Sequence, residues 1–164
     1  MDLTTTSWAD IPSEPFVEDE AEVASEHHRF REECIDKLRQ VGLRPTRQRL
    51  MLGTFLFSKG GRHVTAEMLH AEAVEARMHI SLATVYNTLN QFRDAGLLRQ
   101  IGVDGTKSFF DTNPTTHPHF FVDREDRLLD VPDPGIEIDR LPEPLPGYEI
   151  SQVEVIVHLR RKRG

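Results

Sequence analysis

The chain has 164 residues, of which 38% are hydrophobic, and it carries a formal net charge of −7 at pH 7. This length can bury one modest core or two small ones. No run approaches the ~18 apolar residues of a membrane span, and the N-terminus lacks the basic and then apolar pattern of a secretory signal. We therefore expect a cytoplasmic protein that has no membrane partner. The single cysteine, Cys34, cannot form an internal disulfide or a Cys-x-x-Cys zinc site, and we expect it to be a half-buried helix residue.

The charge is distributed unevenly along the sequence. Residues 1–40 carry a net charge of −7 and residues 111–164 a net charge of −4, whereas residues 41–110 carry +4. The acidic residues from Glu14 to Glu22, together with Pro12 and Pro15, predict a disordered acidic tail over residues 1–28. We call residues 41–110, with their net charge of +4, the basic module. The negative charge of the whole chain does not exclude nucleic-acid binding, because near a phosphate the field of the basic module matters more than charges farther away.

Two helices with short connections are predicted in the first half of the basic module. From Pro45 and Thr46 onward, apolar residues recur at helical spacing until Gly60–Gly61 ends the pattern. Thr65 is a natural N-cap for the second helix. A third helix follows from Ser81, and three helices with short turns predict a helix-turn-helix core.

The helix predicted over residues 81–94 has two different faces. Val85, Leu89 and Phe92 form an apolar stripe, and Gly96 follows as a natural stop. The rest of its surface lacks the Glu and Lys of a merely solvated helix and carries side chains of the kind that read base edges and phosphates in a DNA major groove. These side chains are Thr84, Tyr86, Asn87, Asn90 and Arg93. An ordinary amphipathic surface helix is the alternative interpretation of this segment alone.

Short strands follow the three helices. Residues 97–101 and 106–110 can pair around a glycine-containing turn, and a helix-turn-helix followed by a hairpin is a winged helix. Further strands are predicted at residues 119–122, 127–131 and 150–159, with a proline-rich connection at 132–146 that allows only a short helix. The predicted fold class is α+β. It comprises a winged-helix DNA-binding domain over residues 29–113 and a small α/β dimerisation and sensing domain over residues 114–164, which is too small to stand well alone.

Histidines and carboxylates gather around the predicted domain boundary. His117 and His119 lie on one side of an extended segment because they are two residues apart, and Asp111 and Asp130 flank them in sequence. His63 precedes the helix that Thr65 caps. Mixed imidazole and carboxylate ligands suit zinc, manganese or ferrous iron. The alternative is that these are solvated histidines near a hinge.

Three segments resemble the ferric uptake regulator family: Gly-Leu-Arg-Pro-Thr-Arg-Gln-Arg at 42–49, His-Val-Thr-Ala-Glu at 63–67 and Ser-Leu-Ala-Thr-Val-Tyr-Asn-Thr-Leu-Asn at 81–90. The resemblance covers residues 35–131. Within the family, the segments at 104–107, 110–113 and 146–150 are most similar to the iron response regulator branch. The resemblance implies a homodimer and a hinge metal site with Fe, Mn or Zn as its ion. The implied ligands are His63, Asp111, His117, His119 and Asp130.

We therefore predict a transcription regulator, or repressor, that binds double-stranded DNA at a palindromic operator. Tyr86 and Asn87 are expected to meet base edges, and Ser81 and Thr84 to meet phosphate or base. Arg44 is expected to reach the DNA backbone or minor groove.

The iron response branch implies control of iron homeostasis and haem biosynthesis in response to haem or metal status. That branch typically has three consecutive histidines, whereas Pro118 stands at the central position here, so haem would have to use His117 and His119. A manganese, zinc or peroxide sensor of the same family is the nearest alternative. A winged-helix protein-interaction module is the alternative from another class. An enzyme is not expected, because the chain shows neither a Gly-rich phosphate loop nor a Ser or Cys nucleophile setting.

Overall fold

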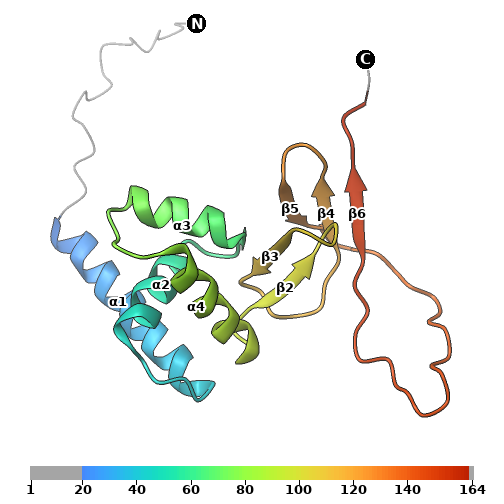
Figure 1. Cartoon of the computed structure of the whole chain (residues 1–164), viewed down its shortest axis with the longest axis horizontal. Helices are drawn as coiled ribbons and strands as arrows, with labels where there is room; N and C mark the ends of the chain where they lie inside the picture. The colour runs from blue at the N-terminus through green and yellow to red at the C-terminus, as the bar shows by residue number, and fades with distance from the viewer. Residues whose placement is uncertain (1–19, 163–164) are drawn as a thin grey trace, which may run out of the picture.

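The computed structural model describes residues 20–162, which form a helical module followed by two small β-sheets (Figure 1). The fold is α+β, as predicted from the sequence. Within the described range, every helix is too short or too polar to cross a bilayer.

Four helices make up the module: α1 (Glu20–Gln40), α2 (Arg47–Phe57), α3 (Ala66–Glu75) and α4 (Leu82–Asp94). Each of the last three begins directly after the hydroxyl residue that caps it, namely Thr46, Thr65 or Ser81. In each cap the side-chain oxygen accepts a hydrogen bond from the backbone N–H three residues later, which satisfies a donor that the first turn leaves free. The predicted helix-turn-helix core is therefore confirmed.

The helices enclose one continuous apolar core. All four contribute side chains that are at most 1% exposed. Burial of such side chains supplies the main favourable term in folding. The largest members are Leu38 from α1, Leu52 and Leu56 from α2, Leu69 from α3, and Leu89 and Phe92 from α4.

Helix α1 corrects two expectations from the sequence. The predicted disordered tail included residues 20–28, but these residues belong to α1, while residues 1–19 lie outside the described part of the chain. The Arg29 guanidinium lies 3.8 Å from a carboxylate oxygen of Glu26 and 3.8 Å from one of Glu33. Ion pairs between residues three and four positions apart therefore stabilise the exposed part of the helix. Cys34 is 1% exposed rather than half-buried, because α2 packs directly over it.

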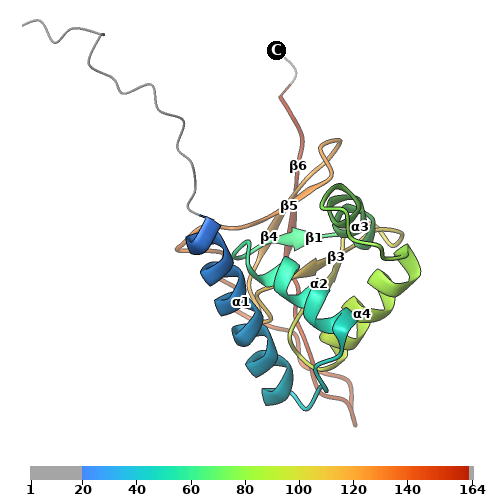
Figure 2. The ribbon, with the colours of Figure 1, turned by 90° about the vertical axis from the view of Figure 1, so that its left-hand side faces the viewer.

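Each β-sheet has three strands. The first pairs β1 (His63–Val64) and β2 (Arg99–Gly102) with the central β3 (Ser108–Asp111), all antiparallel. The β2–β3 hairpin is the predicted wing. The second sheet has β4 (His119–Val122) at its centre, antiparallel to β5 (Arg127–Asp130) and parallel to β6 (Ile156–Leu159). Figure 2 shows the strands behind the helices when α1 and α2 face the viewer.

The last strand is shorter than predicted. The alternating sequence suggested a strand over residues 150–159, but β6 comprises only Ile156–Leu159. Its neighbour β4 is four residues long, and pairing runs from His119 opposite Ile156 to Val122 opposite Leu159. Residues before Val155 meet no neighbouring strand within the described chain, and an extended segment without a hydrogen-bonding neighbour is not a strand.

Helix α2 packs tightly against Cys34 of α1 at Gly53. A methyl group built at this position would lie 2.6 Å from Cys34 Sγ and 3.4 Å from the Phe92 ring. We expect Gly53→Ala to lower the free energy of unfolding by about 1–3 kcal/mol, because overpacking outweighs the gain of up to about 1 kcal/mol in helix propensity. Chemical denaturation measures the change. Combining Gly53→Ala with Cys34→Ala removes the sulfur atom and should recover part of the loss, whereas strictly additive losses would contradict the steric explanation.

Candidate metal centre and nucleic-acid interface

Two pairs of facing residues meet where the two sheets come together. In the first sheet His63 of β1 lies opposite Asp111 of β3. In the second sheet His119 of β4 lies opposite Asp130 of β5. His117 joins them from the segment that leads into β4, so the five predicted metal ligands come from both sheets. One ligand atom from each of these five residues lies within 4.8 Å of all the others.

The Nε2 atoms of the three imidazoles face the same two carboxylate oxygens. Asp111 Oδ2 lies 3.3 Å from Nε2 of His63, 3.1 Å from that of His117 and 3.2 Å from that of His119. Asp130 Oδ1 lies 3.0 Å from His63 Nε2 and 2.9 Å from His117 Nε2. Asp111 is 1% exposed, whereas Asp130 is open to solvent. The cluster is therefore closed to solvent around Asp111 and accessible to solvent at Asp130.

The loop between β3 and β4 orients these ligands through short-range hydrogen bonds. The Asn113 backbone N–H donates to Asp111 Oδ1, which leaves Oδ2 turned toward the imidazoles. His117 Nδ1 lies 2.9 Å from the Thr115 carbonyl oxygen, so Nδ1 carries the proton and Nε2 keeps its lone pair in the neutral ring. Such a tautomer is the one a metal requires at Nε2.

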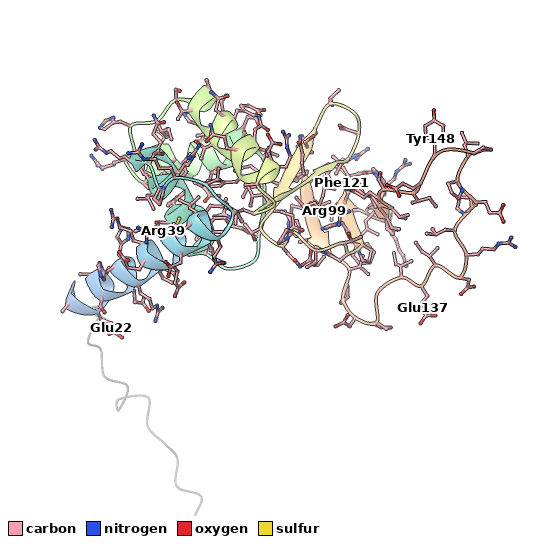
Figure 3. The ribbon with its side chains drawn as sticks, turned by 90° about the horizontal axis from the view of Figure 1, so that it is seen from below. Glu22, Arg39, Arg99, Phe121, Glu137 and Tyr148 are labelled. Carbon is pink, nitrogen blue, oxygen red and sulfur yellow. The ribbon has the colours of Figure 1, made fainter. Side chains whose placement is uncertain are left out.

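Arg99 is a positioning residue that the sequence did not indicate. Its guanidinium donates from Nη1 to the Thr115 carbonyl, the same oxygen that holds His117, and from Nη2 to Glu154 Oε1. Arg99 begins β2 of the first sheet, and Figure 3 shows it among the strands, beyond the helical module. The side chain is 10% exposed, so its two hydrogen bonds are shielded and tie three segments together. The sequence around Arg99 does not predict its contact with Glu154, because the two residues are 55 positions apart.

The electrostatics of the cluster fit a bound cation. Burial alone would disfavour the charged form of His63, but Asp111 and Asp130 outweigh it and raise the pKa of this imidazole. Burial opposes ionisation of Asp111 as well, but contacts with His119 and His63 hold the pKa of this carboxyl well below its ordinary value. His63 Nε2 is buried and makes no well-aligned hydrogen bond despite its close neighbours. Three neutral nitrogens and two carboxylates form a doubly negative donor set that suits Zn²⁺, Mn²⁺ or Fe²⁺.

The predicted DNA-contacting residues lie around the N-terminal half of α4. Ser81, Tyr86 and Asn87 are exposed, and Thr84 is partly so. Ser81 Oγ caps the helix and lies 2.9 Å from Thr84 Oγ1, so both hydroxyls are engaged with each other. The Tyr86 hydroxyl donates to Glu67 Oε1 of α3, which lowers the pKa of Glu67 and raises that of Tyr86. Of the two side chains predicted to read bases, Tyr86 is thus hydrogen-bonded to α3, whereas Asn87 has no such hydrogen bond to Glu67.

Arg44 is exposed in the turn before α2, next to the same surface. Its carbonyl oxygen accepts a hydrogen bond from Arg49 Nη1, and Arg49 Nε donates to Gln91 Oε1 of α4. Arg49 thus fixes the Arg44 turn relative to α4. The sequence did not assign this role to Arg49, because its two contacts belong to different elements.

We expect His119→Ala to reduce affinity for Mn²⁺ and Zn²⁺ strongly, because it removes a buried ligand. Isothermal titration of the metal-free protein measures this loss. The matched control is His158→Ala, which removes an imidazole that contacts Asp123 outside the cluster. Equal affinity in the two variants would show that the cluster does not hold the ion.

Metal affinity should also fall as pH decreases, because protons compete for the imidazole nitrogens. The raised pKa of His63 means that competition in the parent chain begins above the value of about 6.5 for free histidine. The same titrations repeated across pH 5–8 measure this dependence. An affinity that stays constant over this range would contradict imidazole ligation.

Comparison with known proteins supports one family. The Ferric uptake regulator family matches residues 40–158. The peroxide-responsive repressor PerR of Staphylococcus aureus is 31% identical over 131 residues, which cover 79% of this chain and 87% of that protein.

Solved structures of the family share the fold. One is the ferric uptake regulator from Pseudomonas aeruginosa with manganese, which has 24% identity and a TM-score of 0.59 over 79% of this chain and 98% of that one. Another is a zinc-bound manganese uptake regulator with 20% identity and a TM-score of 0.56, over 79% of this chain and 99% of that one. The matched residues include the winged helix and all five clustered side chains, and the chain belongs to the ferric uptake regulator family.

Proposed function

We propose that this protein is a dimeric, metal-responsive transcription regulator that binds a palindromic DNA operator and acts in iron homeostasis. The observation that carries the proposal is the cluster of three imidazoles and two carboxylates, built from both sheets directly beside a winged helix. A cation at this place would connect the DNA-binding module to the second sheet. Regulators of this family are transcription factors rather than enzymes, and the cluster supplies ligands rather than a nucleophile.

The DNA side of the proposal rests on the exposed polar face of α4 and the basic turn before α2. Asn87 has the amide geometry that pairs with adenine in the major groove. Arg44 would contact phosphates or the minor groove, and the Ser81–Thr84 pair lies at the positive end of the helix dipole, which favours phosphate. Tyr86 would read a base with its ring, or with its hydroxyl after leaving Glu67.

Metal and DNA sites are connected by a short path through the fold. His63 lies two residues before Thr65, which caps α3, and Glu67 in the first turn of α3 accepts the hydrogen bond from Tyr86. A change in the position of His63 on metal binding would therefore be passed to α3 and to Tyr86 on α4. Such a path lets the ion favour one arrangement of the recognition helix, which is the condition for coupling two sites.

The proposed dimer would cover apolar side chains that are exposed in the single chain. Figure 3 shows Glu137 and Tyr148 on an extended segment that projects away from the second sheet. Leu145 is 71% and Tyr148 73% exposed, which is unfavourable for large apolar groups in one contiguous stretch. The same segment exposes Ile136, Ile138, Leu141 and Ile150. A second copy is the partner that the family supports, and its two-fold axis would match a palindromic operator.

Residues 104–107, 110–113 and 146–150 support the iron response branch and hence control of haem biosynthesis. Haem binding through His117 and His119 would require a rearrangement, because His119 is 2% exposed and both imidazoles face carboxylates. A haem titration that gives the same absorbance change in His119→Ala as in the parent would remove these imidazoles from haem recognition.

The relationship to peroxide-responsive repressors favours a second candidate, a sensor in which bound iron reports peroxide. Iron differs from zinc in having accessible redox chemistry, so the metal alone should decide the response. Loss of DNA binding after peroxide treatment of iron-loaded but not zinc-loaded protein would support this candidate over a pure metal sensor.

We expect Asn87→Ala to weaken binding to a specific operator by about 1–3 kcal/mol, the usual cost of losing a bidentate base contact. Arg44→Ala should instead weaken binding to all sequences and reduce the salt dependence by about one unit. Fluorescence anisotropy with metal-loaded protein, specific DNA and random DNA measures both effects. Metal removal should reduce operator affinity in the parent. An Asn87→Ala variant with parental specificity would exclude Asn87 from base reading.

We expect the double variant Leu145→Asp/Tyr148→Asp to be monomeric, because two charges would enter an interface that must exclude water. Light scattering of the full chain measures the mass. The matched control is Ala24→Glu/Ala71→Glu, which adds the same charge at exposed positions of α1 and α3, outside the projecting segment and the metal cluster. A dimer that persists unchanged in the first variant would contradict a role for this segment in assembly.

A further inference from the structure

Helix α2 borders a groove whose lining includes none of the five clustered side chains of the candidate metal centre. Figure 2 shows α1 and α2 side by side. A cavity of about 700 Å³ lies between α1, α2 and the connection from α3 to α4. A second hollow of about 510 Å³ adjoins it and shares Arg47, Met51 and Met78 as lining residues. We call the combined depression the α2 groove.

The α2 groove has an apolar floor and a basic rim. Leu50, Met51, Phe55 and Met78 are only partly buried and line its floor. The charged residues that line it are Arg31, Arg47 and Arg77, accompanied by His27 and His79, and none of its lining residues is acidic. Its most suitable occupant therefore combines negative charge with large apolar side chains. Flexible methionines on the floor can adapt to aromatic groups.

One segment of the same chain has this composition. Residues 1–19 contain five acidic residues and no lysine or arginine. Between these acidic residues stand Trp8, Ile11, Phe16 and Val17. DNA would satisfy the basic rim but would leave the apolar floor uncovered, whereas an acidic segment with aromatic residues matches both parts.

The connection to α1 puts this segment within reach of the groove. Residue 19 is joined to the first residue of α1, and His27 at the groove lies about 10 Å farther along that helix. Nineteen residues can span up to about 60 Å when extended, which exceeds this distance severalfold. A covalent connection of this kind gives an effective concentration in the millimolar range, so even weak contacts suffice for docking.

We propose that residues 1–19 dock in the α2 groove, with their carboxylates against the arginine rim and their aromatic side chains on the methionine floor. A consequence for regulation rests on the proposed function: Arg47 and Pro45 line the groove next to Arg44, so the docked segment would reduce the positive potential of the DNA-binding surface. Residues 1–19 would then compete with the operator. The docking itself does not depend on DNA binding.

The only tryptophan of the protein, Trp8, lies in this segment and reports on docking. In the full chain we expect Trp8 fluorescence at shorter wavelength and with less acrylamide quenching than in a water-exposed indole. Arg31→Glu/Arg47→Glu should abolish both effects, and high salt should weaken them. Arg127→Glu/Arg140→Glu is the matched control, since it makes the same change in net charge at exposed positions that do not line the groove.

A second variant changes only the segment and leaves the residues of the groove as they are. Asp10→Asn/Glu14→Gln/Glu18→Gln removes three negative charges from residues 1–19 and should also release Trp8. Circular dichroism and the melting temperature test whether the Arg31→Glu/Arg47→Glu variant is still folded. A water-exposed Trp8 in the parent, or protection that survives the groove substitutions, would overturn the proposal. Protection that disappears on dilution would assign the segment to a second molecule and overturn docking within the chain.

Deletion of residues 1–19 separates the two proposals. With competition, the shortened chain binds operator DNA more tightly than the parent, and the added peptide of residues 1–19 reverses the gain. If Trp8 is protected but deletion leaves DNA affinity unchanged, docking stands and competition is wrong. If neither chain binds any DNA while Trp8 remains protected, the proposed function fails and docking stands.

Discussion

The architecture depends on the meeting of two carboxylates with three imidazoles where the two sheets join. Asp111 is almost completely buried, and a buried carboxylate is costly unless it is paired and hydrogen-bonded. Its neighbours come from β1, from β4 and from the loop between the sheets, so no single element satisfies it. These polar contacts join the second sheet to the first, together with a buried apolar cluster of Ile101, Val103 and Phe109 from the first sheet and its hairpin and Phe121 and Leu128 from the second. A divalent cation would neutralise the negative charges of both carboxylates. The same cluster therefore connects the two sheets and is the candidate metal-sensing site.

The helices were predictable from sequence because their signals are local. Caps at Thr46, Thr65 and Ser81 and apolar residues three or four apart determine where a helix begins and which face it buries. Helix α1 was not among the three predicted helices, and residues 20–28 were assigned to a disordered tail because their exposed, mostly charged and polar side chains form no apolar stripe. The length of β6 depends on its neighbour β4, and no pattern within residues 150–159 contains that information.

The candidate site was predictable only in part. The two-residue spacing places His117 and His119 on one side of the chain, but the position of Asp130 opposite His119 is a matter of strand register. Family resemblance supplied what spacing could not. Arg99 and Arg49 remained unnoticed because their partners are 55 and 42 residues away, and long polar side chains are usually solvated. Contacts of this kind follow from tertiary structure alone.

Strand β4 would connect the proposed dimer interface with the proposed metal site. Strand β4 carries His119 and pairs with β6, which forms an edge of its sheet. A second copy that adds to this edge, or that covers the apolar segment before it, would restrict β6 and thereby β4. The position of a metal ligand would then depend on the state of the interface. By thermodynamic linkage, an ion that prefers one position of His119 must also alter the affinity between the two copies.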